Sequence, residues 1–565
     1  MLTGILYFVM IKLGFGRNFV SVIALLFVYS YGVMTGFSMA TLRAVVMITL
    51  SIIATFSGDN YDMLTGVFVA DFVIFIYQPF RILDISVWLS SFAILGVCLG
   101  QYIIKNVKYL KYINSLRKRL LATLIVSFSI NVVMLPVVVY TYHEVPIFSI
   151  FLNLIVIPLM TYVMISGIGA LIFSVFDISL GAVLVFPGKM ILSLYEKLCE
   201  GINLLPVSTI NIGEIKLYHA LIYYSGIVLI IIIYNKNVNP KIRQRFYIKT
   251  RYWFDYKKWR RIFAAISFAI IALDLGFCYV TYRVRLGEQI EFIDVGQGDG
   301  ILIRTSDGLK FVVDGGSISV KNIGKYTLEP CLKYNEMAHV DYWFISHTDT
   351  DHIQGLVDIL EAGSLSGIKI DNLVLSKSII NSENANKDNL IKLAHDNKIN
   401  VMGFGTNDEM CGDSFSLKCL HPDFDYQNEN VNDMSLALEY ISDKFDVYLM
   451  GDMSADSLSY MMETENLSAA DTKDESTDVD GRGADDRNES TDEQQIRILK
   501  VPHHGSKYSI CDEFYENYSF DYAVISCGER NLYGHPHKET LDYIKKRGIQ
   551  ILRTDKNGGV VFKLN

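Results

Sequence analysis

The stretch Ile345-Ser-His-Thr-Asp-Thr-Asp-His352 places two histidines and two carboxylates within six residues, directly after the largely apolar run 340–344. Such a run is typical of a buried strand, so the polar residues lie on the loop that leaves its end, where layered α/β folds place their chemistry. Neutral imidazole and carboxylate are the usual ligands of zinc and manganese. The stretch therefore predicts a site for one or two metal ions. The alternative is a polar turn with incidental charges.

Other strand ends in the second half of the chain carry residues of the same kind. Residues 447–452 form an apolar run that ends in Gly-Asp, and 496–506 read as a strand followed by Pro-His-His-Gly-Ser. Upstream, 289–303 contain two apolar runs around a glycine-rich turn, and 310–316 end in an acid and two glycines. Repetition of this arrangement predicts that the ligands converge on one site. A helix that starts near Ile353 would aim its positive end at that site.

The composition of the chain changes sharply near its middle. Its 565 residues are too many for one core, so at least two domains are expected. Residues 1–281 are dominated by long apolar runs, whereas 288–565 have the composition of a soluble domain. The net charge of -9 averages over these two parts and gives little guidance about partners. The eight cysteines lack a CxxC spacing, which argues against a cysteine zinc site.

Long apolar stretches predict a polytopic α-helical membrane domain over residues 1–235, followed by a basic loop and a final span within 236–287. A bilayer span needs about 20 apolar residues. The clearest candidates are 18–36, 39–57, 85–104, 120–141, 147–166, 218–234 and 262–281. Further or re-entrant candidates are 61–78, 160–176 and 181–203. We therefore expect eight to ten spans in a multi-pass protein of the plasma membrane.

Two basic stretches predict the orientation of the chain in the membrane. Residues 105–119 carry six Lys and Arg and no acid, and 236–261 carry ten with one acid. Positively charged loops stay in the cytoplasm. The span 262–281 then leads outward, and the second half of the chain is expected to be extracytoplasmic. Anchoring to anionic lipid also explains the basic stretches, and it gives the same orientation.

Polar residues inside apolar spans are costly and often functional. Arg43 lies near the start of the span 39–57, where its side chain either reaches the interface or faces the bundle interior. Asp71 is a second candidate for an interior polar site. Asn131 and Asn153 lie in apolar surroundings, and both are expected to form hydrogen bonds between helices.

The order of potential ligands resembles that of the metallo-β-lactamase fold, an αββα domain that would cover 288–565. The phrases Phe292-Ile-Asp-Val-Gly-Gln-Gly-Asp299, Val501-Pro-His-His-Gly-Ser506 and Asn531-Leu-Tyr-Gly-His-Pro536 are similar to those of the ComEC family of DNA-internalisation competence proteins. In the apolar half, Thr41-Leu-Arg-Ala44 and Asn153-Leu-Ile-Val-Ile-Pro158 are similar to phrases of that family's competence domain. The resemblance covers nearly the whole chain.

The chain also departs from that family. Its members usually begin with further spans, a small OB-like domain and a Ser-Gly-Leu-His phrase, and none of these precedes Met1. These absences leave three alternatives open: a fragment, a gene model that starts late, or a reduced paralogue that lacks the usual N-terminal region. The soluble half also carries an insert at 463–493 with twelve acids and three basic residues, whose composition predicts a disordered loop.

The resemblance implies a site for two divalent ions, Mn²⁺ or Zn²⁺. Metallo-β-lactamase folds usually take one more histidine from the middle of the domain, where only His395 and His421 occur, and neither has the glycine-rich context of the other ligands. The paired histidines can instead serve one ion each. The assignment is then His347, Asp349 and His503 for the first ion, Asp351, His352 and His504 for the second, and Asp452 as the bridge.

Further residues are expected to support these ligands. Asp294 and Asp314 would accept hydrogen bonds from ligand histidines. Ser506, Lys507 and His535 are candidates for phosphate contact or for protonating the leaving group. For His535 the alternative is a structural turn histidine before Pro536.

The leading hypothesis is DNA uptake during natural competence, in which the bundle conducts single-stranded DNA and a two-metal nuclease degrades the other strand. The implied partners are DNA, the lipid bilayer, and other competence proteins such as a DNA receptor and a cytoplasmic translocase. One alternative is a membrane-tethered phosphodiesterase or esterase that acts on envelope or small-molecule substrates. Another is a transporter with a vestigial hydrolase. The soluble half shows no evident basic strip for DNA, which counts against the nuclease.

Overall fold

The computed structural model divides the chain into two compact units, Met1–Tyr279 and Val280–Asn565. It describes residues 2–106, 115–203, 205, 208–234, 265–269, 271–273, 276, 287–424, 426, 428, 430–474 and 495–563. The basic stretch 236–261, most of 105–119 and part of the expected span 262–281 lie outside the described residues.

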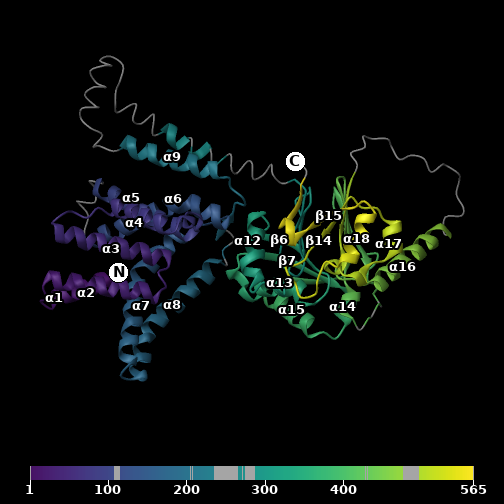
Figure 1. Ribbon diagram of the computed structural model, residues 1–565, viewed down its shortest axis with the longest axis horizontal. Helices are drawn as coiled ribbons and strands as arrows, with labels where there is room; N and C mark the ends of the chain where they lie inside the picture. The colour runs from purple at the N-terminus through teal and green to yellow at the C-terminus, as the bar shows by residue number, and fades with distance from the viewer. Residues whose placement is uncertain are drawn as a thin grey trace, which may run out of the picture. The chain divides into compact units, whose positions relative to one another are not determined.

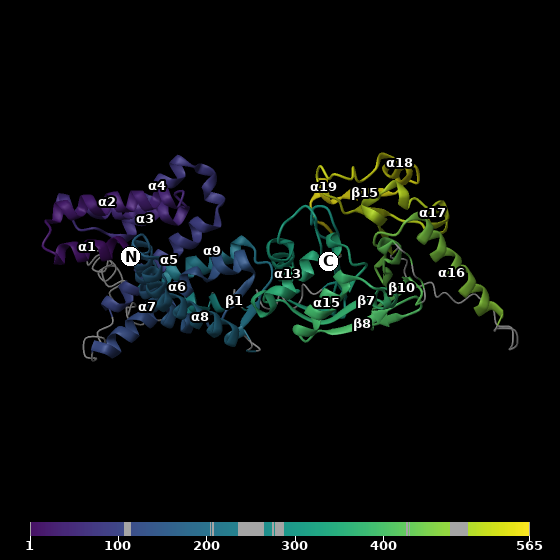
Figure 2. The same ribbon diagram turned by 90° about the horizontal axis from the view of Figure 1, so that it is seen from below.

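The first unit is built from helices (Figures 1 and 2). They are α1 (Leu2–Lys12), α2 (Arg17–Met34), α3 (Met39–Ser57), α4 (Met63–Tyr77), α5 (Ile85–Asn106), α6 (Ser115–Tyr142), α7 (Ser149–Ser174), α8 (Ile178–Asn203) and α9 (Leu217–Tyr234). A short antiparallel pair, β1 (Glu144–Pro146) and β2 (Thr209–Asn211), joins the chain before α7 to the chain before α9.

Six of these helices are long and apolar enough to cross a membrane: α2, α3, α5, α6, α7 and α8. The expected spans 147–166 and 160–176 form the single helix α7, because Pro158 lies inside it without ending it. The candidate 61–78 contains only the 15-residue helix α4. Within the described residues, the number of full-length spans is therefore lower than the predicted eight to ten.

Small residues allow neighbouring helices to approach closely. A Cβ atom added at Gly96 of α5 would lie 2.6 Å from the Cα of Ile130 in α6, and one at Gly100 would lie 2.8 Å from the Cα of Val126. The spacing of Gly96 and Gly100 is that of a small-xxx-small contact between membrane helices. Any larger residue at either position would push the two backbones apart.

Arg43 faces the interior of the bundle and does not reach for the interface. Its guanidinium lies 2.8 Å from Asp71 of α4 and donates to the hydroxyl of Ser90 and, at 3.0 Å, to the carbonyl of Val87, both in α5. The side chain is buried, so the pair holds α3, α4 and α5 together. Among the described residues no hydrogen bond joins Asn153 to another helix, whereas the interhelical bond predicted for Asn131 is found with Ser149.

The second unit contains two seven-stranded sheets. In order across the first sheet, the strands are β16 (Val560–Lys563), β3 (Gln289–Phe292), β4 (Gly300–Arg304), β5 (Lys310–Asp314), β6 (His339–Ile345), β7 (Lys369–Ser376) and β8 (Asn400–Phe404). In the second sheet they are β15 (Gln550–Arg553), β14 (Tyr522–Ile525), β13 (Ile496–Lys500), β12 (Phe445–Leu449), β11 (Ala437–Ser442), β10 (Phe415–His421) and β9 (Glu409–Cys411).

These sheets pack face to face and are covered by helices on both outer sides. One apolar cluster lies between them and includes Phe311 and Phe344 of the first sheet and Tyr440 of the second. A second cluster packs α12 (Glu329–Tyr334), α13 (Thr350–Ala362) and α15 (Ala385–Asp396) on the first sheet. A third packs α16 (Ala455–Asp474), α17 (Asp512–Asn517) and α18 (Lys538–Lys546) on the second, as Figure 1 shows. The αββα layers of the predicted metallo-β-lactamase-like fold are thereby confirmed.

The same edge of both sheets receives the residues predicted to be ligands. Strands β5 to β8 are parallel, and so are β12 to β15. Their carboxyl ends therefore lie together, as parallel strands require. The chain leaves β6 at Ile345, β12 at Leu449, β13 at Lys500 and β14 at Ile525, and each of the following loops contributes to the site.

The first part of the acidic insert is helical and not disordered as predicted. Helix α16 continues to Asp474, so 463–474 are helical, and the rest of the insert, 475–493, lies outside the described residues. Burial of Leu458, Met461 and Met462 anchors the start of α16, and helix extension from an anchored turn is cooperative. The composition of the insert does not show that buried residues before it hold the start of a helix.

Candidate metal centre

The histidine loop is held between a strand and a helix. Asp349 occupies the N-cap position of α13, which starts at Thr350, three residues before the predicted start. His347 therefore lies on the loop and His352 in the first turn of the helix, and their ring centroids are 4.0 Å apart. Both rings are fully buried. The two imidazole rings, one from the loop and one from the first turn of the helix, therefore lie side by side in the interior.

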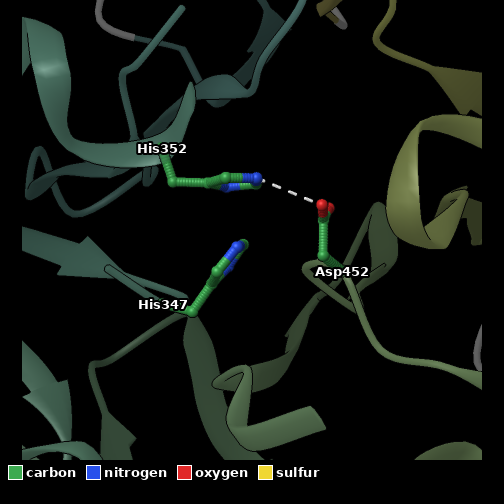
Figure 3. A group of neighbouring side chains, drawn as sticks. All are labelled: His347, His352 and Asp452. Carbon is green, nitrogen blue, oxygen red and sulfur yellow. Dashed lines mark ion pairs between the residues drawn. The ribbon is translucent and has the colours of Figure 1, made fainter. Parts of the chain in front are cut away.

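Donor atoms from three separate segments meet at this point. His347, His352 and Asp452 form one group in which one ligand atom of each lies within 4.8 Å of the others (Figure 3). Asp351, His352 and His504 form a second such group. Asp452 lies between them, with Oδ1 3.5 Å from His352 Nε2 and Oδ2 3.5 Å from His504 Nε2. The second group coincides with the set assigned to the second ion from the sequence.

Hydrogen bonds on the far side of each ring leave the Nε2 atoms free to face the site. Nδ1 of His504 lies 3.0 Å from the carbonyl of Ser526 and must donate to it. Nδ1 of His352 lies 2.9 Å from Asp314 Oδ2, and Nδ1 of His347 lies 3.1 Å from the Ser346 hydroxyl. Such outer partners fix the tautomer of a ligand histidine.

Asp314 takes the supporting position predicted for it. Its two oxygens accept hydrogen bonds at 2.7 Å from the backbone N–H and the hydroxyl of Ser346, in addition to the contact with His352. Its backbone adopts a positive φ of 58°, and its carbonyl accepts from the indole of Trp343 at 3.0 Å. Asp314 therefore joins the end of β5 to the histidine loop.

The donor set fits divalent metal ions. Nε2 of His347, His352 and His504 and Oδ1 of Asp452 are buried and have no hydrogen-bond partner among the described residues. Unpaired buried polar atoms are costly, and a cation bound by them would satisfy all four. Imidazole nitrogens mixed with carboxylate oxygens suit zinc and manganese.

Burial and neighbouring charges shift the pKa values of these groups. Burial, followed by the neighbouring His352, lowers the pKa of His347 to about 3. Burial also opposes a charge on His504, but Asp452 and Asp299 outweigh it and raise its pKa to about 10. Asp452 is buried as well, yet His504 and His352 hold its pKa well below the ordinary value. His504 therefore carries a second proton near pH 7. A cation bound at its Nε2 would replace that proton, so metal binding would release it.

Asp299 is the residue that the sequence interpretation missed. Its Oδ1 lies 3.5 Å from His504 Nδ1, and its other oxygen forms an ion pair with Lys500 of β13, with both side chains buried. Asp294, predicted for a bracing role, is exposed and accepts only from the backbone N–H of Gly296 at 3.2 Å. That prediction is corrected, because the turn through Gly296 and Gly298 points Asp299 inward instead. The positive φ values of both glycines, 77° and 150°, are the signal for this turn.

The remaining predicted ligands lie at the rim of the cluster. Asp349 Oδ2 is 3.8 Å from His347 Nε2, and Asp351 Oδ2 is 3.5 Å from His504 Nε2. His503 Nε2 is 4.0 Å from Asp452 Oδ2, and this ring is partly exposed. His503 and His504 both adopt positive φ, 49° and 53°, which sends one ring to the rim and the other inward.

The three expected substrate contacts lie at different depths. Ser506 is buried and its hydroxyl caps the short helix that follows, accepting from the N–H of Tyr508 at 3.4 Å. Lys507 is exposed, with Nζ 5.3 Å from the centre of the Tyr508 ring. The ring of His535 lies 5.6 Å from that of His503, and burial lowers its pKa to about 4. Of the three, Lys507 is exposed and His535 is partly exposed.

Neither of the two other histidines considered from the sequence joins the cluster. His421 ends β10, where its Nε2 lies 2.9 Å from the carbonyl of Asp433 and its ring packs against Tyr426 and Tyr460. His395 lies in the last turn of α15.

Comparisons with known proteins agree with the resemblance found in the motifs. Residues 1–237 match the family model Competence, described as Competence protein. The chain is 23% identical over 576 residues to ComE operon protein 3 of Bacillus subtilis (strain 168), covering 100% of this chain and 66% of that protein. It is 38% identical over 68 residues to Competence protein ComA of Neisseria gonorrhoeae, covering 12% of this chain and 10% of that protein. The chain thus spans less than two thirds of the length of these relatives.

Three solved structures are similar to about half of the chain at 12% identity. They are the metallo-β-lactamase fold protein YhfI from Bacillus subtilis (TM-score 0.29, 49% of this chain and 100% of that one), the diiron β-hydroxylase CmlA from Streptomyces venezuelae (0.28, 49% and 54%) and a diphosphatase of the PhnP family (0.28, 49% and 98%). Scores this low add nothing to the fold assignment, which stands on the two packed sheets and their helices. Residues 1–237 match the competence protein family model, and the chain is similar to ComE operon protein 3 along its whole length.

Proposed function

We propose that this chain acts in DNA uptake during natural competence, with the helical unit as the conduit for single-stranded DNA and the second unit as a nuclease. The observation that carries the nuclease role is the convergence of three unpaired Nε2 atoms, from His347, His352 and His504, on the carboxylate of Asp452. The conduit role rests on the match of residues 1–237 to the competence family.

The proposed site holds two divalent ions, Mn²⁺ or Zn²⁺. His347, Asp349 and His503 would hold one, and Asp351, His352 and His504 the other. Asp452 would bridge them, since its two oxygens face different histidines. Ions bound in this way supply Lewis-acid stabilisation of the phosphoryl oxygens and a water acidified for attack.

The chain's own groups would position the substrate around this centre. Helix α13 begins at Thr350, so the first N–H groups of a 13-residue helix face the site and favour an anionic phosphate. His535 is neutral near pH 7 because its pKa is about 4, so it would donate a hydrogen bond to a phosphate oxygen and not deliver a full proton. Asp314 and the Ser526 carbonyl would keep the ligand rings in place.

The hydrolase unit is proposed to lie outside the cytoplasm. The basic stretches at 105–119 and 236–261 favour the cytoplasmic side. The helices α6, α7 and α8 and the shorter apolar helix α9 lie between them. With α9 as a fourth crossing, the chain returns to the side where it started. This even number supports a common side for both stretches. A DNA receptor outside and a translocase inside are the proposed partners.

A strain that carries Asp351→Ala and His352→Ala tests the proposal. During transformation with end-labelled duplex DNA, this strain should release no labelled nucleotides, although the substituted protein is still present in the membrane. Normal strand degradation in that strain would refute the nuclease role. Hydrolysis of small phosphodiesters but not of DNA by the purified chain would favour the envelope phosphodiesterase instead.

A further inference from the structure

Beside the metal centre, one loop presents large side chains to solvent. Leu532 is 100% exposed and Tyr533 is 57% exposed. The loop is held in shape by Asn531, which donates to the carbonyl of Gly528 at 2.9 Å and accepts from the N–H of His535 at 2.9 Å. Leu532 and Tyr533 are therefore displayed by a braced turn.

A continuous series of rings connects this loop to the metal ligands. Tyr533 stacks on His535 with the ring centroids 5.7 Å apart and the planes at 24°. The His535 ring lies 5.6 Å from that of His503 and 6.2 Å from that of His504. The series thus runs from a solvent-exposed tyrosine to the residues that line the centre.

A second aromatic and a cation border the same series. His537 lies 4.9 Å from His535, ring to ring, and its Nδ1 accepts from the backbone N–H of Lys507 at 3.2 Å. Next to Lys507, Tyr508 is 70% exposed, and the Lys507 ammonium lies over its ring. This rim therefore pairs flat aromatic faces with a positive charge, and a strand of stacked bases with a phosphate backbone has the complementary surface.

We propose that Tyr533 and Tyr508 form a stacking subsite for unpaired nucleobases, which makes single-stranded nucleic acid the preferred substrate of this site. The proposal rests on the proposed nuclease function and adds the form of the substrate. In a duplex the base faces are already stacked on each other, so only an unpaired strand can offer them to Tyr533 while its phosphodiester reaches the histidines. Lys507 contacts the backbone phosphates, and Leu532 covers the edge of the stacked base.

The test uses the full chain in lipid nanodiscs with MnCl₂ and a fluorescein-labelled single-stranded dT20. The KM of the unsubstituted chain should be at least tenfold lower for dT20 than for a 20-base-pair duplex. Tyr533→Leu and Tyr508→Leu should each raise the KM for dT20 about tenfold with little change in kcat, because base stacking on an aromatic side chain is lost. Tyr533→Phe keeps the ring and should retain the KM. Tyr334→Leu, an exposed tyrosine at the end of α12, is the control.

Different failures have different meanings. If the chain cleaves dT20 and both leucine variants keep the original KM, the subsite is refuted, the exposed rim serves lipid or a protein partner, and the nuclease function stands. The subsite is also refuted if the duplex is the better substrate. If the chain hydrolyses bis(p-nitrophenyl) phosphate but neither nucleic acid, the nuclease function itself is wrong, and the subsite is refuted with it.

Discussion

Asp314 Oδ2 lies 2.9 Å from Nδ1 of His352, while the same carboxylate holds the N–H and hydroxyl of Ser346. One side chain at the end of β5 thus fixes both the tautomer of a metal-site histidine and the path of the loop that carries His347. This arrangement makes Asp314, with its positive φ at the end of a strand, a positioning residue for the proposed ligands.

Asp314→Asn should weaken metal binding while leaving the fold intact. Asparagine tolerates the positive φ but is neutral. His352 then loses the charged acceptor of its Nδ1 hydrogen bond, and its Nε2 becomes a less basic ligand. The affinity for Mn²⁺ or Zn²⁺ should fall about 10- to 100-fold, measured by titration of the metal-free chain. Asp294→Asn removes an exposed acid of the neighbouring turn and should leave the affinity unchanged. Equal affinities for both variants would contradict the positioning role.

Asp299 and Lys500 should affect stability through their mutual charge pairing, so that removing one charge costs more than removing both. Asp299→Asn leaves the buried Lys500 ammonium without its counter-charge, which costs about 3–5 kcal/mol in comparable cases. The double variant Asp299→Asn, Lys500→Met removes both charges and should recover most of the loss. Thermal unfolding of the metal-free chain in detergent would measure this. A double variant as unstable as the single one would show that the charge pairing is not the cause.

Acid should destabilise the second unit through His421. Burial lowers the pKa of His421 from its ordinary 6.5 to about 4. The folded state therefore keeps the ring neutral, whereas the unfolded chain takes up a proton below pH 6.5. The stability that this ring contributes is complete above pH 6.5 and is lost as the pH falls, by about 1.4 kcal/mol per pH unit until about pH 4.

The variant His421→Gln isolates this effect. Glutamine can still donate to the Asp433 carbonyl but does not titrate. Between pH 7 and pH 5, in the presence of EDTA, the unfolding temperature of the unsubstituted chain should fall more than that of the variant. The other buried histidines are common to both chains and cancel in the comparison. Parallel pH profiles would show that His421 is not a source of the acid sensitivity.

The proposed orientation predicts the labelling of Cys411, an exposed cysteine in β9. A membrane-impermeant maleimide should modify it in intact spheroplasts. A cysteine introduced at Lys249, within the basic stretch, should react only after permeabilisation. Cys411→Ser is the control for modification of the other native cysteines. The reverse pattern of labelling would place the hydrolase unit in the cytoplasm.

The sequence predicted the features that depend on local pattern. Apolar runs that end in an acid or a histidine identified the strand ends at His347, Asp452 and His504, and parallel strands then bring such ends to one edge. The αββα layers were predicted from the resemblance of the ligand order to the metallo-β-lactamase fold. These signals are carried by consecutive residues, so the fold and most of the cluster could be anticipated.

Features that depend on distant partners or on the path of a turn could not be anticipated in the same way. Asp294 and Asp299 lie in one phrase, and only the glycine turn between them decides which acid is buried. Arg43 had two possible environments until Asp71, 28 residues away, was found beside it. Among the described residues, the candidate spans 147–166 and 160–176 proved to be one helix, because hydropathy does not show that α7 continues through Pro158.

Metal-dependent cleavage of linear DNA by the purified full chain tests the central claim most directly. Asp452→Asn removes the charge that faces both His352 and His504, and Asp456→Asn, an exposed acid in the first turn of α16, is the matched control. The account predicts cleavage with Mn²⁺ that EDTA abolishes, a loss of at least about 100-fold in Asp452→Asn by comparison with other transition-state contacts, and full activity in Asp456→Asn. Absence of cleavage with Mn²⁺ and with Zn²⁺, or equal rates in both variants, would contradict it.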